Sequence, residues 1–433
     1  MAFTGATAGL AAGAQTNDTR LDYALEATYK VSPTGNYQAL RITGDSLSRS
    51  QTTSRPDEIN EIKEVAQSVV TQISASGSIS GALSTTTYDD FLSGVFGDDW
   101  LATPPSVTVS ATATATLTSK SAAAGGHDLI SGSISFASFP DHGTVRVLDP
   151  TNQIDAFVPY ISLDGGLRLV GGMLPVTADT ALSNGSTITL ADIENSNVDK
   201  TFTIRKKILG NFLMYPGSLI NQAQIQLQQG QFGTVSFDLL SANEVRSQTD
   251  LATSVLPAPT GKVHNTVNNF LGCWINGVQP EGCVTTATLT FGRDGSGSDY
   301  GLGHADACGV RSGSFTASGS IEFYFRTWDQ YQQMLDDVQA PVVIKTADDA
   351  GNGYAIVFKN AALRNGKIPT SGKNQTFKVS FDLEGNPAEE SEGTCAIFRL
   401  VGAFHDNTPA NAVTQDGNPV TLGGSPVTLT DKS

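Results

Sequence analysis

The stretches Ile73-Ser-Ala-Ser-Gly-Ser-Ile79 and Phe315-Thr-Ala-Ser-Gly-Ser-Ile321 are near copies of each other and decide the fold of this chain. In both, apolar residues or glycine alternate with Ser or Thr. Successive side chains of an extended strand point to opposite faces, so this period of two predicts strands with one buried and one solvated face. The side chains expected on the solvated faces are Ser74, Ser76, Ser78, Ser80, Thr316, Ser318, Ser320 and Glu322.

A short amphipathic helix is expected after each strand. The segment Thr86-Thr-Tyr-Asp-Asp-Phe-Leu92 is similar to Trp328-Asp-Gln-Tyr-Gln-Gln-Met-Leu335 once one inserted residue is allowed. Apolar residues three and four positions apart lie on one side of a helix, which predicts a buried face on each. The expected faces are Tyr88, Phe91, Leu92 and Val95 in the first helix, and Tyr331, Met334, Leu335 and Val338 in the second.

Two further matches keep the same order along the chain. Val235-Ser-Phe-Asp-Leu239 recurs unchanged as Val379-Ser-Phe-Asp-Leu383, and Ala39-Leu-Arg-Ile-Thr-Gly44 is weakly similar to Ala287-Thr-Leu-Thr-Phe-Gly292. Short matches in Ser- and Thr-rich strands arise by chance, but four of them in one order rarely do. We therefore predict a tandem duplication of one β unit with a flanking helix.

The first copy is expected to carry an insertion, because its strand and its pentapeptide lie further apart than those of the second copy. Residues 98–200 contain 11 Asp and Glu against 4 Lys and Arg, a net charge of −7, and are predicted to form a small acidic β-domain. Its candidate strands are Gly143–Val147, Gly166–Val170 and Ser186–Leu190. The expected organisation is a flexible arm (1–34), a first unit (35–97 plus 201–250), the insertion (98–200), a second unit (251–389) and a C-terminal extension (390–433).

Composition favours an all-β chain that does not grip nucleic acid. Short runs rich in Thr, Val, Ile and Phe are separated by Gly, Asn, Asp and Pro, as in proteins made of many strands. The net charge is −16 and the isoelectric point about 4.6, whereas proteins that bind nucleic acid neutralise phosphates with basic patches. The acidity suits a protein that never meets DNA, one that lets DNA slide past, or simply a soluble one.

Targeting and redox signals are weak. Residues 1–19 contain no Lys or Arg, so the charged start of a secretory signal is missing, and no apolar run is long enough to span a membrane. The cysteines form no CxxC pair, so a zinc ribbon is not expected. We expect reduced thiols of a cytoplasmic protein, with a disulfide formed after release from the cell as the alternative. They are Cys273, Cys283, Cys308 and Cys395.

No catalytic or metal-binding motif is complete. Gly44-Asp-Ser-Leu47 matches the nucleophile block of GDSL-type hydrolases, but no His of the chain has Asp three positions before it to complete the triad. Asp348-Asp-Ala-Gly-Asn-Gly353 resembles the start of a calcium loop, yet Lys359 stands where a bidentate Glu is required. A hairpin turn is favoured there, with a surface cation site as the alternative. We expect no enzyme, no cofactor and no bound metal.

Taken together, the ordered blocks resemble the duplicated type of phage tail tube protein over about residues 35–389. The resemblance is carried by Leu40–Leu47, the Ser-Gly-Ser-Ile strand, Tyr88–Leu92 running to Gly97–Trp100, Lys200–Arg205, Trp274–Gly277 and Asp349–Tyr354. The stretch after Lys206 departs from the family pattern, and residues 390–433 have no counterpart in it. These departures concern the outer surface and the C-terminus.

The resemblance implies a structural virion protein of a long-tailed phage, assembled in the host cytoplasm and located in the tail. Edge strands of its β-sandwich domains would join copies into rings, and a duplicated chain would make a pseudo-six-fold ring of three copies, a homohexamer being the alternative. The rings would stack into a tube that meets the tape measure, tail terminator and distal tail or baseplate proteins. DNA would pass through the lumen without specific binding. The candidate stacking loop contains Arg55, Asp57, Glu58, Glu61, Lys63 and Glu64.

The main alternative is a secreted β-sandwich adhesin or carbohydrate-binding module. Such a protein usually carries exposed aromatic platforms, and the chain has three tryptophans, Trp100, Trp274 and Trp328. The tube of a phage-derived particle is a further alternative that has the same sequence features as the tube of a virus.

Overall fold

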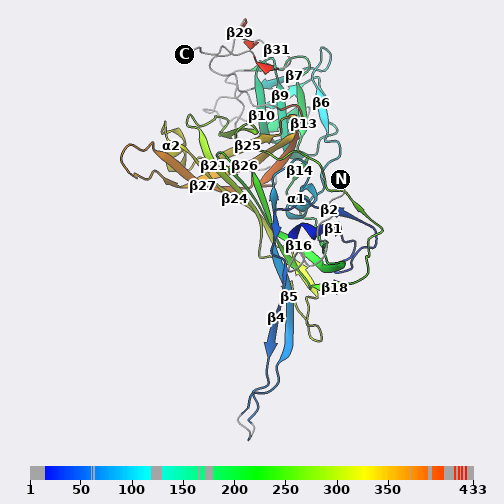
Figure 1. The fold of residues 1–433 in the computed structure, drawn as a ribbon. Helices are drawn as coiled ribbons and strands as arrows, with labels where there is room; N and C mark the ends of the chain where they lie inside the picture. The colour runs from blue at the N-terminus through cyan, green and yellow to red at the C-terminus, as the bar shows by residue number, and fades with distance from the viewer. Residues whose placement is uncertain are drawn as a thin grey trace, which may run out of the picture.

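The computed structural model describes residues 15–59, 61, 64–118, 129–163, 166–170, 179–370, 372–388 and 393–403, and the backbone of four short strands between 414 and 426. These residues are mostly in strands, with two α-helices among them, which confirms the all-β prediction. Figure 1 shows a long hairpin that projects from one end of the molecule and a small β-domain at the other.

The central feature is a run of antiparallel strands that crosses both halves of the chain. Each strand in the run pairs with the next one, and the short strand β3 (Gly44–Asp45) continues β4 along the edge of β5. In spatial order the run is β4 (Ser48–Ser54), β5 (Val69–Ala82), β17 (Thr234–Ser241), β16 (Asn211–Gln228), β21 (Val284–Asp294), β24 (Ser314–Tyr324), β27 (Lys378–Asn386) and β26 (Gly353–Lys367).

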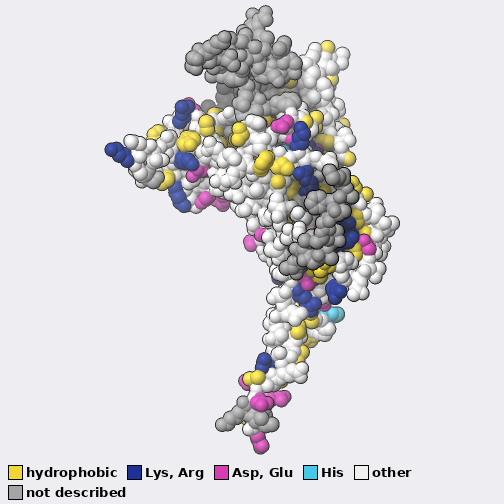
Figure 2. All heavy atoms as spheres, in the orientation of Figure 1, with side chains coloured by type: hydrophobic (Ala, Val, Ile, Leu, Met, Phe, Trp, Pro, Cys, Tyr) yellow, Lys and Arg dark blue, Asp and Glu magenta, His cyan; other side chains and the backbone are white. Residues whose placement is uncertain are grey.

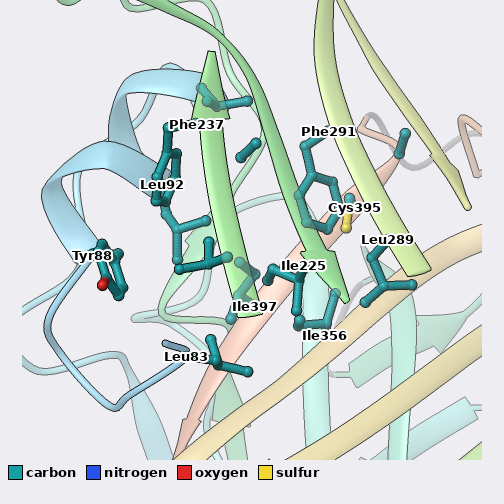
Figure 3. Packing of buried hydrophobic residues seen from close by; sticks show 14 of the residues in the cluster. Leu83, Tyr88, Leu92, Ile225, Phe237, Leu289, Phe291, Ile356, Cys395 and Ile397 are labelled. Carbon is teal, nitrogen blue, oxygen red and sulfur yellow. The ribbon is translucent and has the colours of Figure 1, made fainter. Parts of the chain in front are cut away.

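Most of one face of this run is buried because apolar residues alternate with polar ones in strands such as β17, β21 and β24, whereas β4 is exposed throughout. Ile225, Phe237 and Leu289 come from three neighbouring strands, and none is more than 2% exposed. Figure 3 shows these side chains filling the space beside α1, together with Leu92 of that helix. The strands of the two halves therefore share one hydrophobic core.

Further strands fold over this buried face as a second layer. β16 pairs with β15 along its first part and with β17 and β21 along its second, and β26 likewise pairs first with β25 and then with β27. The added strands are β1 (Arg20–Leu25), β2 (Asn36–Ala39), β14 (Ile193–Glu194), β15 (Phe202–Ile208), β18 (Val245–Ser247), β19 (Ser254–Leu256), β20 (Phe270–Ile275), β25 (Ala340–Ala347) and β28 (Cys395–Leu400).

The two expected helices form, but their environments differ. All four apolar residues predicted for the first helical segment are buried, and α1 (Asp89–Phe96) ends at Gly97, which has a left-handed conformation. In the second, α2 (Asp329–Leu335), Leu335 is 61% exposed and Val338 is 42% exposed. The prediction of a buried face was wrong for these two residues, because no described part of the chain covers them.

The insertion folds as a separate sheet with its own core, and the three candidate strands lie within β9, β11 and β13 or overlap them closely. It packs on the second layer through the rings of Phe157 and Phe398, whose centres are 4.9 Å apart, and through an ion pair between Asp155 and Lys345. Its strands are β6 (Ser106–Thr108), β7 (Ala115–Thr118), β8 (Leu129–Gly132), β9 (His142–Asp149), β10 (Ile154–Leu163), β11 (Gly166–Leu169), β12 (Thr180–Ala181) and β13 (Thr187–Leu190).

Both ends of the predicted organisation contribute strands that the sequence did not predict, and for the arm this corrects the prediction. Residues 20–25, expected in a flexible arm, form β1, which pairs with β15 and buries Leu21 and Tyr23. The C-terminal extension supplies β28, which lies between β26 and β14 and so joins the two halves. In each case a short apolar run gains a partner strand that is distant in sequence. Residues 1–14 lie outside the described residues.

The remaining small elements are a 3-10 turn and three two-stranded pairs. They are Thr16–Asp18, β22 (Gly297–Asp299) with β23 (Gly309–Arg311), β29 (Thr414–Gln415) with β30 (Asn418–Pro419), and β31 (Thr421–Leu422) with β32 (Ser425–Pro426).

Candidate assembly surface

The repeated sequence blocks occupy equivalent places in the sheet. The pentapeptide Val235–Leu239 pairs with β5, and its copy Val379–Leu383 pairs with β24 in the same register. The matching central pairs are Phe237 with Ile79, and Phe381 with Ile321.

The weaker fourth match was wrong by six positions. Ser50 pairs with Ser74 of β5, and Gly292 pairs with Thr316 of β24, which is the position equivalent to Ser74 in the second copy. Ser50 is therefore the equivalent of Gly292. The segment that corresponds to 287–292 is therefore 45–50 and not 39–44. Leu47 corresponds to Leu289 in this alignment, and both are buried. Ser and Thr alternate on both strands, so the sequence alone did not distinguish the two alignments.

The eight side chains predicted on the solvated faces of β5 and β24 all lie on one face of the continuous run, and none of them is buried. We call this surface the polar face. Its serines interact across strands: the Ser46 hydroxyl lies 3.0 Å from that of Ser78, and the Ser80 hydroxyl donates to Ser236 at 3.5 Å. Ser46 belongs to the GDSL-like tetrapeptide and is thus part of this hydroxyl-rich surface.

Sequence reasoning missed the middle and the far side of the polar face. The middle comes from Gln222-Ala-Gln-Ile-Gln-Leu-Gln228 of β16, whose alternation is as regular as that of β5 and would have identified it. The carboxylates of Asp238, Asp382 and Glu384 were missed because they join the polar face only through the pairing of β17 with β5 and of β27 with β24. The Glu322 carboxylate accepts from Lys378 and from Thr285, and these hydrogen bonds lower its pKa.

The polar face ends at an unpaired strand on each side. In the described part of the chain, β4 pairs only with β5, and all seven of its residues are exposed. At the other side, the segment from Leu363 to Lys367 pairs with no described strand but β27, with an irregularity between Arg364 and Lys367 where the Gly366 N–H donates to the Met334 Sδ. Unpaired edges present free N–H and C=O groups that join another strand readily. Exposed apolar residues gather near this second edge: Trp328, Leu335, Val338 and Phe377.

The candidate stacking loop lies at the end of the projecting hairpin that β4 and β5 form (Figure 1). All of its predicted residues that the structure describes are exposed, whereas Lys63 lies outside the described residues. Figure 2 shows acidic side chains gathered at this end, and they belong to Asp57, Glu58, Glu61 and Glu64. A two-stranded ribbon is marginally stable alone, so a surface that receives it would stabilise it.

Other candidate chemistry finds structural explanations. The Asp348 carboxylate accepts from the backbone N–H groups of Ala350 and Asn352, which confirms a hairpin turn between β25 and β26. All four cysteines are free thiols. Within the described ranges no cluster of His, Cys, Asp and Glu has the arrangement of a metal site. No helix in the same ranges combines the length and the apolar character needed to cross a membrane.

An open pocket of about 960 Å³ lies between the insertion and the second half. It contains Trp274, and the Lys345 ammonium covers one face of that ring, 4.0 Å from its centre. Trp100 is likewise stacked against the guanidinium of Arg399, at 4.2 Å.

A β-sandwich with a long polar sheet face, an unpaired strand at each side of it and a projecting hairpin has the form of a structural subunit. The model of the phage tail tube protein family matches residues 16–385, so the chain belongs to that family. This confirms the resemblance, and the protein is a structural component of a phage tail. No curated protein sequence matches the chain.

Proposed function

We propose that copies of this chain join edge to edge into closed rings, and that the rings stack into the tube through which phage DNA leaves the particle. The observation that carries the proposal is the continuous run of eight strands, polar on one face and unpaired at both sides. A sheet of this kind has no edges once it closes on itself. Contacts between two different edges of the same chain generate rings when the rotation closes.

Ring size follows from strand geometry. With strands about 4.8 Å apart and tilted by about 40°, each strand occupies roughly 6.3 Å of circumference. Three chains would supply 24 strands and a barrel about 48 Å across between backbones, which leaves a lumen of roughly 38 Å after side chains are allowed for. Six chains would leave roughly 86 Å by the same geometry. The smaller channel suits a single DNA duplex, so we favour three copies.

The two halves of the chain act as successive units of this ring, which gives it pseudo-six-fold character. The equal register of the two pentapeptides on β5 and β24 supports a duplicated unit of this kind. The first unit would contain β4, β5, β17 and β16, and the second β21, β24, β27 and β26. The insertion packs on the layer opposite the polar face, so it would lie on the outside of the tube.

The polar face would line the lumen. Hydroxyl and amide side chains dominate it, and its basic side chains Arg364 and Lys378 are paired with Glu384 and Glu322, so a passing duplex would make few contacts that release counterions. Weak binding of this kind allows DNA to slide. Asp57, Glu58, Glu61 and Glu64 on the hairpin would contact the next ring. At the ends of the tube the partners would be tape measure, terminator and distal tail or baseplate proteins.

Electron microscopy of the concentrated protein tests this function. We expect hollow stacked rings with three copies of the chain in each, and with the insertion on the outer surface. A ring with six whole chains would overturn the trimer. A persistent monomer under assembly conditions that binds glycans would overturn the tube and favour an adhesin.

A further inference from the structure

We infer that the β4 edge of one chain pairs with the end of β26 in the next chain, with Ser50 opposite Arg364, and that the same contact covers the exposed side of α2. The partner is a second copy of this chain. The inference rests on the proposed ring and specifies its register and its contacts. Its template is a junction that already exists inside each chain, between β16 of the first half and β21 of the second.

The internal junction has two parts. In the sheet, β16 and β21 pair antiparallel, with Gln222 opposite Gly292. Behind the sheet, the end of α1 packs against strands of the second half. The ring of Phe96 lies 5.1 Å from that of Phe291, and the Arg293 Nε donates to the Val95 carbonyl oxygen at 2.6 Å.

The same register connects each strand of this junction to an unpaired edge. Gly292 is opposite Thr316 of β24, and Ser50 is opposite Ser74 of β5. Thr316 lies 242 positions after Ser74, and Gly292 lies 242 positions after Ser50. The β4 edge is thus the first-half equivalent of β21.

On the other side, Gln222 is opposite Asp238, and Arg364 is opposite Asp382. These two aspartates are the same residue of the repeated pentapeptide. The end of β26 is therefore the second-half equivalent of β16. If the external junction copies the internal one, Arg364 of one chain meets Ser50 of its neighbour.

The exposure of α2 supports the same contact independently. Leu92 and Val95 of the first helical segment are 3% and 0% exposed, and the second half of the chain packs at the end of this helix through Phe291 and Arg293. Their counterparts Leu335 and Val338 are 61% and 42% exposed. An apolar helix side that is buried in one half and bare in the other indicates that the cover comes from the next chain.

The neighbour offers a suitable cover. The equivalents of Phe291 and Arg293 are Arg49 and Gln51, which alternate with the polar face of β4 and so point toward the helix side. Arg49 would approach the end of α2, where Asp336 is exposed and the last carbonyl groups also attract a cation. This pairing of a basic strand with an acidic helix end explains why β4 is polar where β21 carries phenylalanine.

Disulfide trapping tests the register. In a Cys283→Ser, Cys308→Ser background, the pair Ser50→Cys and Arg364→Cys should link each chain to the next and give a covalent closed trimer on oxidation. Directly opposite residues are about 4.5–5.5 Å apart between Cβ atoms, within reach of a disulfide, whereas positions two residues away are about 7–8 Å away. The shifted controls Ser48→Cys and Thr52→Cys, each with Arg364→Cys, should link at least tenfold more slowly.

The outcomes separate the two proposals. Faster linking from position 48 or 52, in rings that still form, overturns the register and leaves the tube intact. If the background protein forms no rings by electron microscopy, the tube itself fails and the register with it. As a second measurement, Arg49→Glu should reduce the assembled fraction at least tenfold, and Asp336→Lys should restore it in the double variant. Failure of the rescue, with both variants folded by circular dichroism, would overturn the α2 contact.

Discussion

Asp89 joins the two halves of the chain at a buried point, and its removal is expected to weaken the whole fold. Asp89 is the first residue of α1 and is 7% exposed. It accepts a hydrogen bond from the Tyr354 hydroxyl at 2.5 Å and two from the Arg399 guanidinium, at 2.5 and 3.2 Å. Arg399 in turn stacks on Trp100, and Tyr354 belongs to β26. One carboxylate thus connects α1 to β26 and β28.

The size of the effect follows from what Asp89→Ala leaves behind. Breaking a fully buried ion pair costs about 3–5 kcal/mol because the remaining charge stays unpaired. The side chain of Arg399 is 29% exposed, so water partly solvates its charge. The cost of breaking this ion pair therefore lies below that range. The buried Tyr354 hydroxyl still accepts from the Thr86 N–H, but its own proton loses its acceptor, which adds about 1–2 kcal/mol. We expect a total loss of about 3 kcal/mol, and about half of that for Asp89→Asn, which keeps an acceptor for Tyr354.

Urea unfolding of the unassembled protein measures this loss. A double-mutant cycle with Arg399→Met isolates the ion pair, and we expect a coupling of at least about 1 kcal/mol. Asp57→Ala, at an exposed position of the hairpin, is the matched control and should change stability by less than about 0.5 kcal/mol. A loss below about 1 kcal/mol for Asp89→Ala, or a coupling near zero, would refute the reasoning.

Two further predictions concern the buried residues His264 and Gly81. Burial lowers the pKa of His264 to about 4 from about 6.5, so the unfolded chain binds its proton more readily, and stability should fall as the pH drops through this window. His264→Gln should flatten that decline in urea melts at pH 7 and pH 4.5; an unchanged decline would contradict it. Gly81→Ala would place a Cβ 1.7 Å from the Tyr88 hydroxyl oxygen and should cost about 1–3 kcal/mol in thermal melts, whereas Gly44→Ala, with no atom within 4 Å, should cost much less. Equal losses for the two glycine variants would contradict the second prediction.

The sequence by itself determined the local elements, because alternation along a strand is a property of the chain. None of the alternating polar residues from Ser74 to Ser80 and from Thr316 to Glu322 is buried, and α1 buries its predicted side. The inserted sheet could be anticipated for a related reason, since its strands carry their own alternation and its core is built almost entirely from its own residues.

Tertiary structure alone decided how these elements combine. Pairing partners depend on contacts between residues that are distant in sequence, so the sequence did not reveal that β16 and β21 unite both halves in one sheet. For the same reason the sequence pattern predicted a flexible arm where β1 forms and did not predict β28 in the extension. It also aligned the weakest repeat six positions away from its place in the sheet. The exposure of Leu335, identical in type to the buried Leu92, has the same cause. Whether an apolar side is covered depends on what stands beside it in space.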